Sequence, residues 1–286
     1  MTSVGRILES NGFLLAPGVY DALSAKVARQ AGFEALFISG YSVAASQLGE
    51  PDVGLLTQTE IIDAARRVCR AVDCPVIVDA DTGYGGILNV TRTVQELIAA
   101  GAKGCFLEDQ VWPKRCGHMM GKKVIALEEH VQKLRAAVEA RGTSDFFIVA
   151  RTDAREATDS LDEAIRRAKA FKAAGADAVF VEAPRSLEEL QEISKQVQPP
   201  FVANMLEGGV TPILTREELR SLGFTIAVFP LTGLFAAARA QTDVFAHLRG
   251  TGSTRDIMDR LLTFHDFHRI VDLEGHYALD KRFSVG

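Results

Sequence analysis

The chain has 286 residues, a 47% hydrophobic fraction and a formal net charge of −5, which is the composition of a globular protein with a sizeable core. The mild acidity argues against nucleic acid or a membrane surface as partner, and no apolar stretch reaches the ~18–20 residues of a membrane span. Four cysteines are too few for a disulfide scaffold, so we expect free thiols and a cytoplasmic location without a secretory signal.

Eight short, nearly continuous apolar runs recur along the chain, as expected for strands buried on both faces. In chain order they cover residues 13–17, 35–39, 75–81, 104–109, 146–153, 178–183, 200–205 and 226–230. Helical segments lie between them, and four open with capping-box patterns at 57–60, 160–163, 186–189 and 215–218. This alternation predicts an α/β fold in one domain over residues 1–286, a (β/α)8 barrel of the TIM type. An open doubly wound sheet is the alternative, weakened because no GxGxxG follows the first strand.

Further helices follow the eighth strand. We expect one at about 234–248, a break at RGTGSTRD, and a second amphipathic segment over 256–275. A helix beyond the eighth barrel unit needs a surface to pack against, and a neighbouring subunit is one candidate. Residues 234–286 are therefore predicted to form an interface segment.

Polar side chains follow the predicted strands at their C-terminal ends, where the catalytic groups of parallel barrels gather. Six strand ends in succession carry them, and this predicts a functional site. Asp79 and Asp81 share one face of an extended strand, and Glu108 ends the next strand along the chain. Three converging carboxylates without cationic neighbours favour a divalent cation, Mg²⁺ first and Mn²⁺ second. The alternative is that these residues cap helices or turns.

The loop after the fourth strand carries Cys116-Gly117-His118 among basic residues. A zinc site is disfavoured because no second ligand pair accompanies it. A thiol exposed among these cations should have a lowered pKa and be reactive. Because the loop contains Gly117 and Gly121 and directly follows the strand that ends at Glu108, we interpret it as a lid that brings an acid/base or nucleophilic cysteine to a substrate.

Motifs spread over nearly the whole chain resemble the isocitrate lyase/phosphoenolpyruvate mutase superfamily. They are SGYSVAASQLGEPDVG, VDADTGYGG, LEDQVWPKRCGHMMGKKV, VARTDAR, FVEAP and ANMLEGGVTP, and KRCGH resembles the catalytic-loop signature of the lyase branch. The resemblance implies a barrel whose eighth helix is exchanged between subunits, usually in a homotetramer built as a dimer of dimers.

The resemblance also implies roles for individual residues. The metal set would be Asp79, Asp81 and Glu108, with Asp52 acting through water. The catalytic set would be Cys116 as the loop acid with Arg151, Tyr41 and His118, and the substrate-binding set would be Ser42, Val43, Gly117, Glu182 and Asn204. Tyr41 and a metal-bound water both stay open as the general base.

The reaction that the resemblance implies is Mg²⁺-dependent retro-aldol cleavage of a small di- or tricarboxylate. A substituted malate would give a 2-oxo acid and a carboxylate. The GHMMGKK and EGG stretches resemble members that act on small 2- or 3-substituted malates or on oxaloacetate. We therefore expect alkylmalate cleavage first, oxaloacetate hydrolysis or decarboxylation second and 2-methylisocitrate cleavage third. A catalytically silent ligand-binding barrel is the alternative from another functional class.

Overall fold

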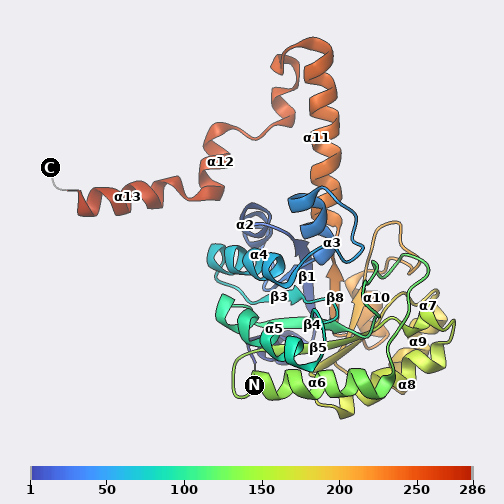
Figure 1. Cartoon of the computed structure of the whole chain (residues 1–286). Helices are drawn as coiled ribbons and strands as arrows, with labels where there is room; N and C mark the ends of the chain where they lie inside the picture. Colours follow the sequence, from blue (N-terminus) through green and yellow to red (C-terminus); the bar gives the residue numbers. More distant parts are fainter. Residues whose placement is uncertain (1, 285–286) are drawn as a thin grey trace.

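The computed structural model describes residues 2–284, and its centre is a closed barrel of eight parallel strands in sequence order (Figure 1). The strands are β1 Leu14–Val19, β2 Leu36–Ile38, β3 Val76–Asp79, β4 Gly104–Glu108, β5 Phe147–Thr152, β6 Ala178–Val181, β7 Phe201–Asn204 and β8 Ile226–Phe229. The barrel closes where Leu14 of β1 pairs with Ile226 of β8. The predicted (β/α)8 fold is confirmed, and the open-sheet alternative is wrong.

Helices surround the barrel and alternate with its strands. The longer ones are α2 Ala22–Gln30, α4 Gln58–Ala71, α5 Ile87–Ala100, α6 Leu127–Arg141, α8 Leu161–Ala173, α9 Leu187–Gln196 and α10 Arg216–Ser221, and α1 Ser3–Asn11 precedes β1. Two short helices follow strands at the C-terminal end of the barrel, α3 Gly40–Val43 with its π-helical continuation Ala44–Leu48, and α7 Ala154–Ala157. These short elements shape the entrance to the barrel.

The four predicted capping boxes form in full only at α4 and α10, where threonine and glutamate exchange side-chain and backbone hydrogen bonds. At α8 and α9 the serine side chain accepts the backbone N–H of the glutamate three residues later, as predicted. The side chain of that glutamate, however, binds an arginine and not the backbone of the serine. Glu163 pairs with Arg167 at 2.7 Å, and Glu189 pairs with Arg155 at 2.7 Å. The charged partner wins because a hydrogen bond between ions is stronger than one to a neutral amide.

The apolar core lies in two layers, one inside the barrel and one between the strands and the surrounding helices. Inside the barrel, the rings of Phe37 and Phe106 lie 4.7 Å apart between centroids, and those of Phe106 and Phe180 lie 5.8 Å apart. All three rings also line the cavity described below. The inner layer therefore forms a rigid apolar floor under the strand ends.

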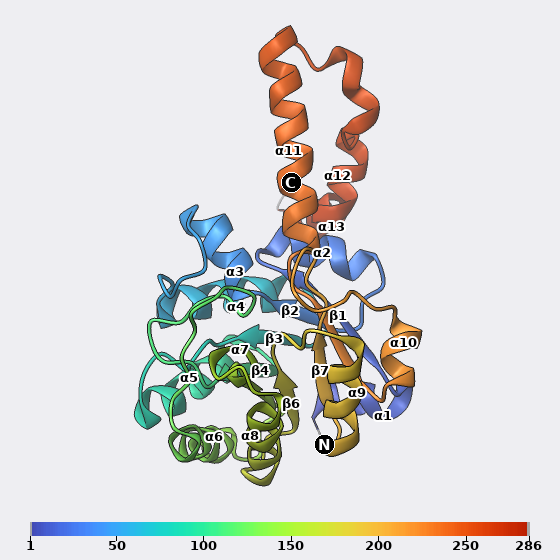
Figure 2. The ribbon, with the colours of Figure 1, turned by 90° about the vertical axis from the view of Figure 1, so that its right-hand side faces the viewer.

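After β8, the chain leaves the barrel as an arm (Figures 1 and 2). The arm consists of α11 Thr232–Thr251, a 3₁₀ turn at Arg255–Arg260, α12 Phe264–Val271 and α13 Leu273–Phe283. None of the residues in α11, α12 and α13 is buried, and Phe264 is 80% exposed. The helix expected at about 234–248 is confirmed as part of α11. Within residues 2–284, no helix combines the length and apolarity required to cross a bilayer.

A groove of about 600 Å³ runs beside the base of the arm, where β1, β8, α2 and α11 meet. Apolar side chains make up much of its wall, among them Leu15, Val19, Val27, Phe33 and Phe229. A helix covers the equivalent position in an ordinary (β/α)8 barrel, but here α11 points away from it (Figure 1). The barrel thus leaves apolar surface uncovered next to an arm that is itself exposed.

Candidate active site

A small cavity lies at the C-terminal ends of the strands, under the loop that joins β4 to α6. Its volume is about 40 Å³, room for roughly three water molecules. Most of the predicted site residues line it, namely Tyr41, Asp52, Asp79, Cys116, Gly117, His118, Arg151, Glu182 and Asn204. The cavity is too small to admit a dicarboxylate from solvent while the loop stays down, so the loop has to open for a substrate.

Four predicted residues do not line the cavity: Ser42, Val43, Asp81 and Glu108. Ser42 is buried and its hydroxyl donates to the carbonyl of Pro230 at 3.1 Å. Val43 is buried in the apolar core, and its N–H donates to Ser39 in the first turn of α3. Both residues stand behind the cavity wall, so their assignment to carboxylate binding stays a prediction.

An acidic cluster forms where β3 and β4 end. The N–H of Asp81 donates to Asp79 Oδ1 at 3.2 Å, and the N–H of Glu108 donates to the Asp81 carbonyl at 2.9 Å. Asp81 has a φ of 47°, a conformation that a non-glycine residue adopts only when its surroundings hold it there. Within the described chain, Asp81 Oδ2 and Glu108 Oε1 are buried without a hydrogen-bond partner. These orphaned oxygens are ligand atoms of the kind that Mg²⁺ prefers.

The expectation that these carboxylates lack cationic neighbours is wrong. Lys114, which is 3% exposed, places its ammonium 2.7 Å from Asp81 Oδ1 and also pairs with Asp52. Arg151 lies 3.3 Å from Glu108 through Nη1. Burial nevertheless raises the pKa of both Asp81 and Glu108, because desolvation outweighs these cations.

A divalent cation suits these residue types, although the side chains are arranged as an ion-paired cluster. Over residues 2–284, no three His, Cys, Asp or Glu side chains converge closely enough to hold a metal ion. Positive charge at Asp81 comes from Lys114 instead. The donor set of Asp79, Asp81 and Glu108 fits Mg²⁺ in chemistry, and Asp81 and Glu108 also contribute buried oxygens without a hydrogen-bond partner among residues 2–284. Metal binding itself stays a prediction.

Asp153 holds the arginine of the cavity. Arg151 donates to the two carboxylate oxygens of Asp153 through Nε and Nη2, both at 2.9 Å, and its Nε lies 3.6 Å from Glu182. Although burial opposes the charge of Arg151, Asp153 and Glu182 hold its pKa well above the usual value. Asp109 orients Asp153 by accepting its N–H at 2.9 Å. Asp153 lies in the VARTDAR motif two residues after Arg151, the spacing that places two side chains on one face of an extended segment.

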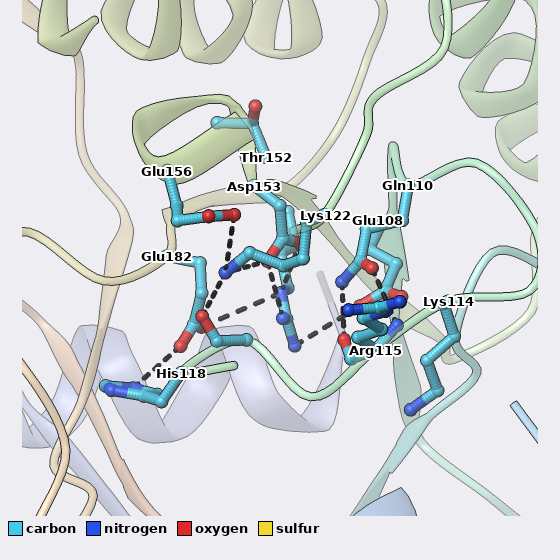
Figure 3. Close-up of polar contacts among 12 residues, drawn as sticks. Glu108, Gln110, Lys114, Arg115, His118, Lys122, Thr152, Asp153, Glu156 and Glu182 are labelled. Atoms are coloured by element: carbon cyan, nitrogen blue, oxygen red, sulfur yellow. Dashed lines mark hydrogen bonds and ion pairs between the residues drawn. The ribbon is translucent and has the colours of Figure 1, made fainter. Parts of the chain in front are cut away.

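His118 has a defined tautomer. The N–H of Val210 donates to its Nδ1 at 3.1 Å, so the ring hydrogen is on Nε2, which lies 2.8 Å from Glu182 (Figure 3). Although burial raises the pKa of Glu182, Arg151 and His118 outweigh it and lower the pKa to about 2. Gly209 permits this docking, because a Cβ there would lie 2.5 Å from His118 Nδ1. The glycine-rich stretch after β7 therefore forms the surface on which the tip of the loop packs.

Cys116 is half-buried, and its environment is the reverse of the one predicted. Burial raises the pKa of its thiol to about 11. The neighbouring basic groups face elsewhere: Lys114 binds the acidic cluster, His118 binds Glu182, and Lys122 donates to the Gly117 carbonyl. The expected low pKa is wrong, and a thiol that keeps its proton at neutral pH is suited to act as an acid.

Part of the cavity wall is apolar. It consists of Leu206, Val228, Pro230 and Leu231, together with the phenylalanine rings of the barrel interior. Leu206 was missed, since a leucine in an irregular loop carries no periodic signal. This wall can accept an alkyl group and offers it no side-chain hydrogen-bond donor.

Similarity to known proteins covers nearly the whole chain. The family model described as phosphoenolpyruvate phosphomutase matches residues 6–249. The chain is 53% identical over 286 residues to the chloroplastic carboxyvinyl-carboxyphosphonate phosphorylmutase of Arabidopsis thaliana, covering 99% of this chain and 84% of the relative. It is 52% identical over 284 residues to the petal death protein of Dianthus caryophyllus (99% and 89%). It is 43% identical over 280 residues to the 2,3-dimethylmalate lyase of Eubacterium barkeri (98% and 96%).

Solved structures of proteins with related names have the same fold as this chain. Oxaloacetate acetylhydrolase in complex with 3,3-difluorooxalacetate is similar with a TM-score of 0.92 and 35% identity, covering 98% of this chain and 95% of that one. A 2,3-dimethylmalate lyase is similar with a TM-score of 0.92 and 36% identity, covering 99% and 95%. A phosphonopyruvate hydrolase in complex with oxalate and Mg²⁺ is similar with a TM-score of 0.88 and 29% identity, covering 99% of both chains.

Proposed function

Because the chain belongs to the phosphoenolpyruvate mutase/isocitrate lyase superfamily, we propose that it cleaves the C2–C3 bond of a substituted malate with the help of Mg²⁺. The predicted class, a carbon–carbon lyase, is supported by relatives that are themselves named lyases. The observation that carries the proposal is that Cys116, Arg151 and Asp79 line one cavity, where burial also raises the pKa of the thiol. A proton donor on a loop is what a cleaved carbon–carbon bond requires.

Each residue then has a part in the reaction. Asp79, Asp81 and Glu108 would hold Mg²⁺, which would polarise the hydroxyl and the adjacent carboxylate of the substrate. Arg151, fixed by Asp153, stabilises the negative charge that develops as the C2–C3 bond breaks. Cys116 donates its proton to the enolate carbon of the departing carboxylate. His118 docks the loop that carries Cys116.

The phenol of Tyr41 is a weak candidate for the general base. Burial raises its pKa, so its hydroxyl keeps its proton at neutral pH. A protonated phenol at the cavity wall is suited to donate a hydrogen bond to a substrate carboxylate. The base is therefore better sought in a water molecule that the acidic cluster activates.

The cavity wall supports an alkylmalate as substrate. Leu206, Pro230 and Leu231 would contact a small alkyl substituent, and each methylene buried there contributes about 0.8 kcal/mol. A hydrated oxaloacetate would place a hydroxyl against the same wall, which offers it no side-chain donor. Hydrolysis of oxaloacetate is the second candidate, because oxaloacetate acetylhydrolase is a close structural neighbour. Cleavage of 2-methylisocitrate, whose additional carboxylate has to fit into the small cavity, is the third.

A substrate panel tests the proposal. Pyruvate release would be followed from 2-methylmalate, 2,3-dimethylmalate and 2-methylisocitrate, and oxalate formation from oxaloacetate, each with Mg²⁺ and with a chelator. We expect metal-dependent pyruvate release, fastest from an alkylmalate. Oxaloacetate turnover alone would reassign the chain to hydrolysis. Silence with every substrate would favour the catalytically silent barrel.

We also propose that the arm joins subunits in a homotetramer built as a dimer of dimers. Exposed apolar side chains of the arm, such as Phe245 and Phe264, match in character the uncovered groove beside β1 and β8. The test is light scattering coupled to size-exclusion chromatography, with Phe264→Asp as the variant and Arg239→Asp as a control on a charged position of the arm. We expect a tetramer that Phe264→Asp dissociates. A monomeric wild type would refute the proposed tetramer.

The four cysteines are free thiols, and we therefore propose the cytoplasm as the location of the protein.

A further inference from the structure

A fully buried lysine lies beneath the tip of the catalytic loop. The side chain of Lys122 is 0% exposed, and its ammonium donates to the carbonyl of Gly117 within the Cys-Gly-His motif. The same ammonium lies 3.4 Å from Asp153 Oδ1 and 3.9 Å from Glu156 Oε2 (Figure 3). Lysine is almost never buried without partners, and this hydrogen bond together with the two longer ion pairs accounts for the position of Lys122.

Lys122 and the cavity arginine share an acceptor atom. Asp153 Oδ1 accepts from Arg151 Nη2 at 2.9 Å and faces the Lys122 ammonium from the other side. A path of contacts therefore runs from the Gly117 carbonyl through Lys122 and Asp153 to Arg151. Both the loop tip and the arginine depend on one carboxylate.

Other contacts also hold the loop, among them those of His118 with Glu182 and Val210 and the hydrogen bond from the Cys116 N–H to the Asp52 carbonyl at 3.1 Å. Gln110 binds the N–H and carbonyl of Arg115 at 2.9 and 2.8 Å near the base of the loop. The N–H of Gly121 donates to Glu156 at 3.1 Å. Gly117 itself packs so tightly on the cavity that a Cβ would lie 2.4 Å from Arg151 Nη2. Lys122 adds to these contacts a charged donor on the Gly117 carbonyl, and its ammonium also reaches Asp153, the partner of Arg151.

We propose that Lys122 is a positioning residue that holds the loop closed and couples its closure to the orientation of Arg151. This inference rests on the proposed lyase function, in which the loop delivers Cys116 to the substrate. Without Lys122, the Gly117 carbonyl loses its ionic donor, and Asp153 keeps only Arg151. The loop then spends more time open, with Cys116 accessible to solvent.

The experiment compares Lys122→Met and Lys122→Arg with wild type, and uses Lys123→Met as the matched control because Lys123 is the exposed neighbour. The rate of Cys116 alkylation by iodoacetamide is measured at one pH by peptide mass spectrometry. We expect alkylation to be about 10- to 100-fold faster in Lys122→Met. This range is the change in the closed-to-open equilibrium that corresponds to loss of one hydrogen bond to a charged group. Lys122→Arg should restore part of the protection, and Lys123→Met should match wild type.

The direction of the change separates loop opening from electrostatics. Removing a positive charge near Cys116 would raise the thiol pKa and slow alkylation, so acceleration reports exposure of the thiol. In turnover, we expect kcat to fall about tenfold or more in Lys122→Met while KM changes less, because the loop acts after substrate has bound. A control variant that loses activity equally would overturn the assignment.

Failure of the inference and failure of the proposed function give different results. Equal alkylation rates in wild type and Lys122→Met would refute the role of Lys122, even if lyase activity is present. Faster alkylation of Lys122→Met in a protein that cleaves no malate would retain the closure role and refute the lyase proposal. Circular dichroism and the melting temperature verify folding, and Lys122→Arg provides the comparison if Lys122→Met does not fold.

Discussion

The pKa of Cys116 decides whether the loop delivers an acid or a nucleophile. Basic residues surround the thiol in the sequence, which predicts a thiolate, whereas burial in the folded protein raises its pKa to about 11. At pH 8 a thiol of pKa about 11 is about 0.1% ionised, and one of ordinary pKa near 8.5 is about a quarter ionised. The structure thus predicts a thiol that is protonated across the neutral range.

The alkylation rate changes less than the ionised fraction does. A thiolate becomes more nucleophilic as its pKa rises, with a slope of about 0.4–0.5, so part of the roughly 200-fold difference in ionisation is compensated. We therefore expect Cys116 to react at pH 8 about 10- to 20-fold more slowly than an ordinary exposed thiol. The pH at which its rate levels off is the more direct measurement.

The assay is iodoacetamide alkylation of metal-free protein over pH 6–11, with the Cys116 peptide quantified by mass spectrometry and Cys116→Ser to confirm the peptide. Cys74, whose pKa burial also raises, serves as an internal comparison. We expect the Cys116 rate to rise throughout the range without levelling off below pH 10. A plateau reached near pH 8 or lower would refute the reasoning and restore the reactive thiolate.

Three further variants test other parts of the structure. Asp153→Asn removes the charged partner of Arg151, and we expect steady-state kinetics to show a fall in kcat of about 10- to 100-fold, the equivalent of one charged hydrogen bond. His130 is fully buried, its ring nitrogens have no hydrogen-bond partner among residues 2–284, and burial lowers its pKa to about 3. The unfolded chain therefore binds more protons than the folded chain between about pH 6.5 and 3, so the free energy of unfolding decreases by about 1.4 kcal/mol for each unit by which the pH is lowered. His130→Leu should lose this dependence when urea unfolding is compared at about pH 7.5 and 5. Leu206→Ala enlarges the apolar wall and should raise kcat/KM for 2-ethylmalate over 2-methylmalate about tenfold.

Each of these expectations has an opposing result. Unchanged kcat in Asp153→Asn would mean that Arg151 keeps its orientation through Glu108 and Glu182 alone. Parallel stability profiles of His130→Leu and wild type would mean that His130 takes up protons in the folded state. An unchanged preference in Leu206→Ala would place the alkyl group elsewhere in the cavity.

Much of the barrel was predictable because its signals are local. The strands are short apolar runs between polar loops, and their observed bounds differ from the predicted ones by at most two residues. Parallel strands also bring their C-terminal ends to one edge, so residues far apart in sequence, such as Asp79, Arg151 and Asn204, were expected to converge. They do line one cavity.

The side-chain pairings in the catalytic loop could not be read in the same way. Lys114 and Lys122 are eight positions apart in an irregular segment, and nothing in the sequence indicates that one binds the acidic cluster and the other the Gly117 carbonyl. Once their ammonium groups point away from Cys116, burial controls the thiol, and the expected sign of its pKa shift reverses. The glutamates at α8 and α9 miss their predicted caps because arginines compete for them: Arg167, one helical turn away, binds Glu163, and Arg155, from the short helix α7, binds Glu189.

The central claim is that Cys116 supplies the proton that completes cleavage of a substituted malate. The most direct measurement is the turnover of 2,3-dimethylmalate to pyruvate and propionate by wild type and Cys116→Ala at saturating Mg²⁺. Loss of a general acid typically lowers a rate by about 10²- to 10⁴-fold, and we predict a decrease in this range with folding unchanged. Equal turnover by the two proteins would contradict the account.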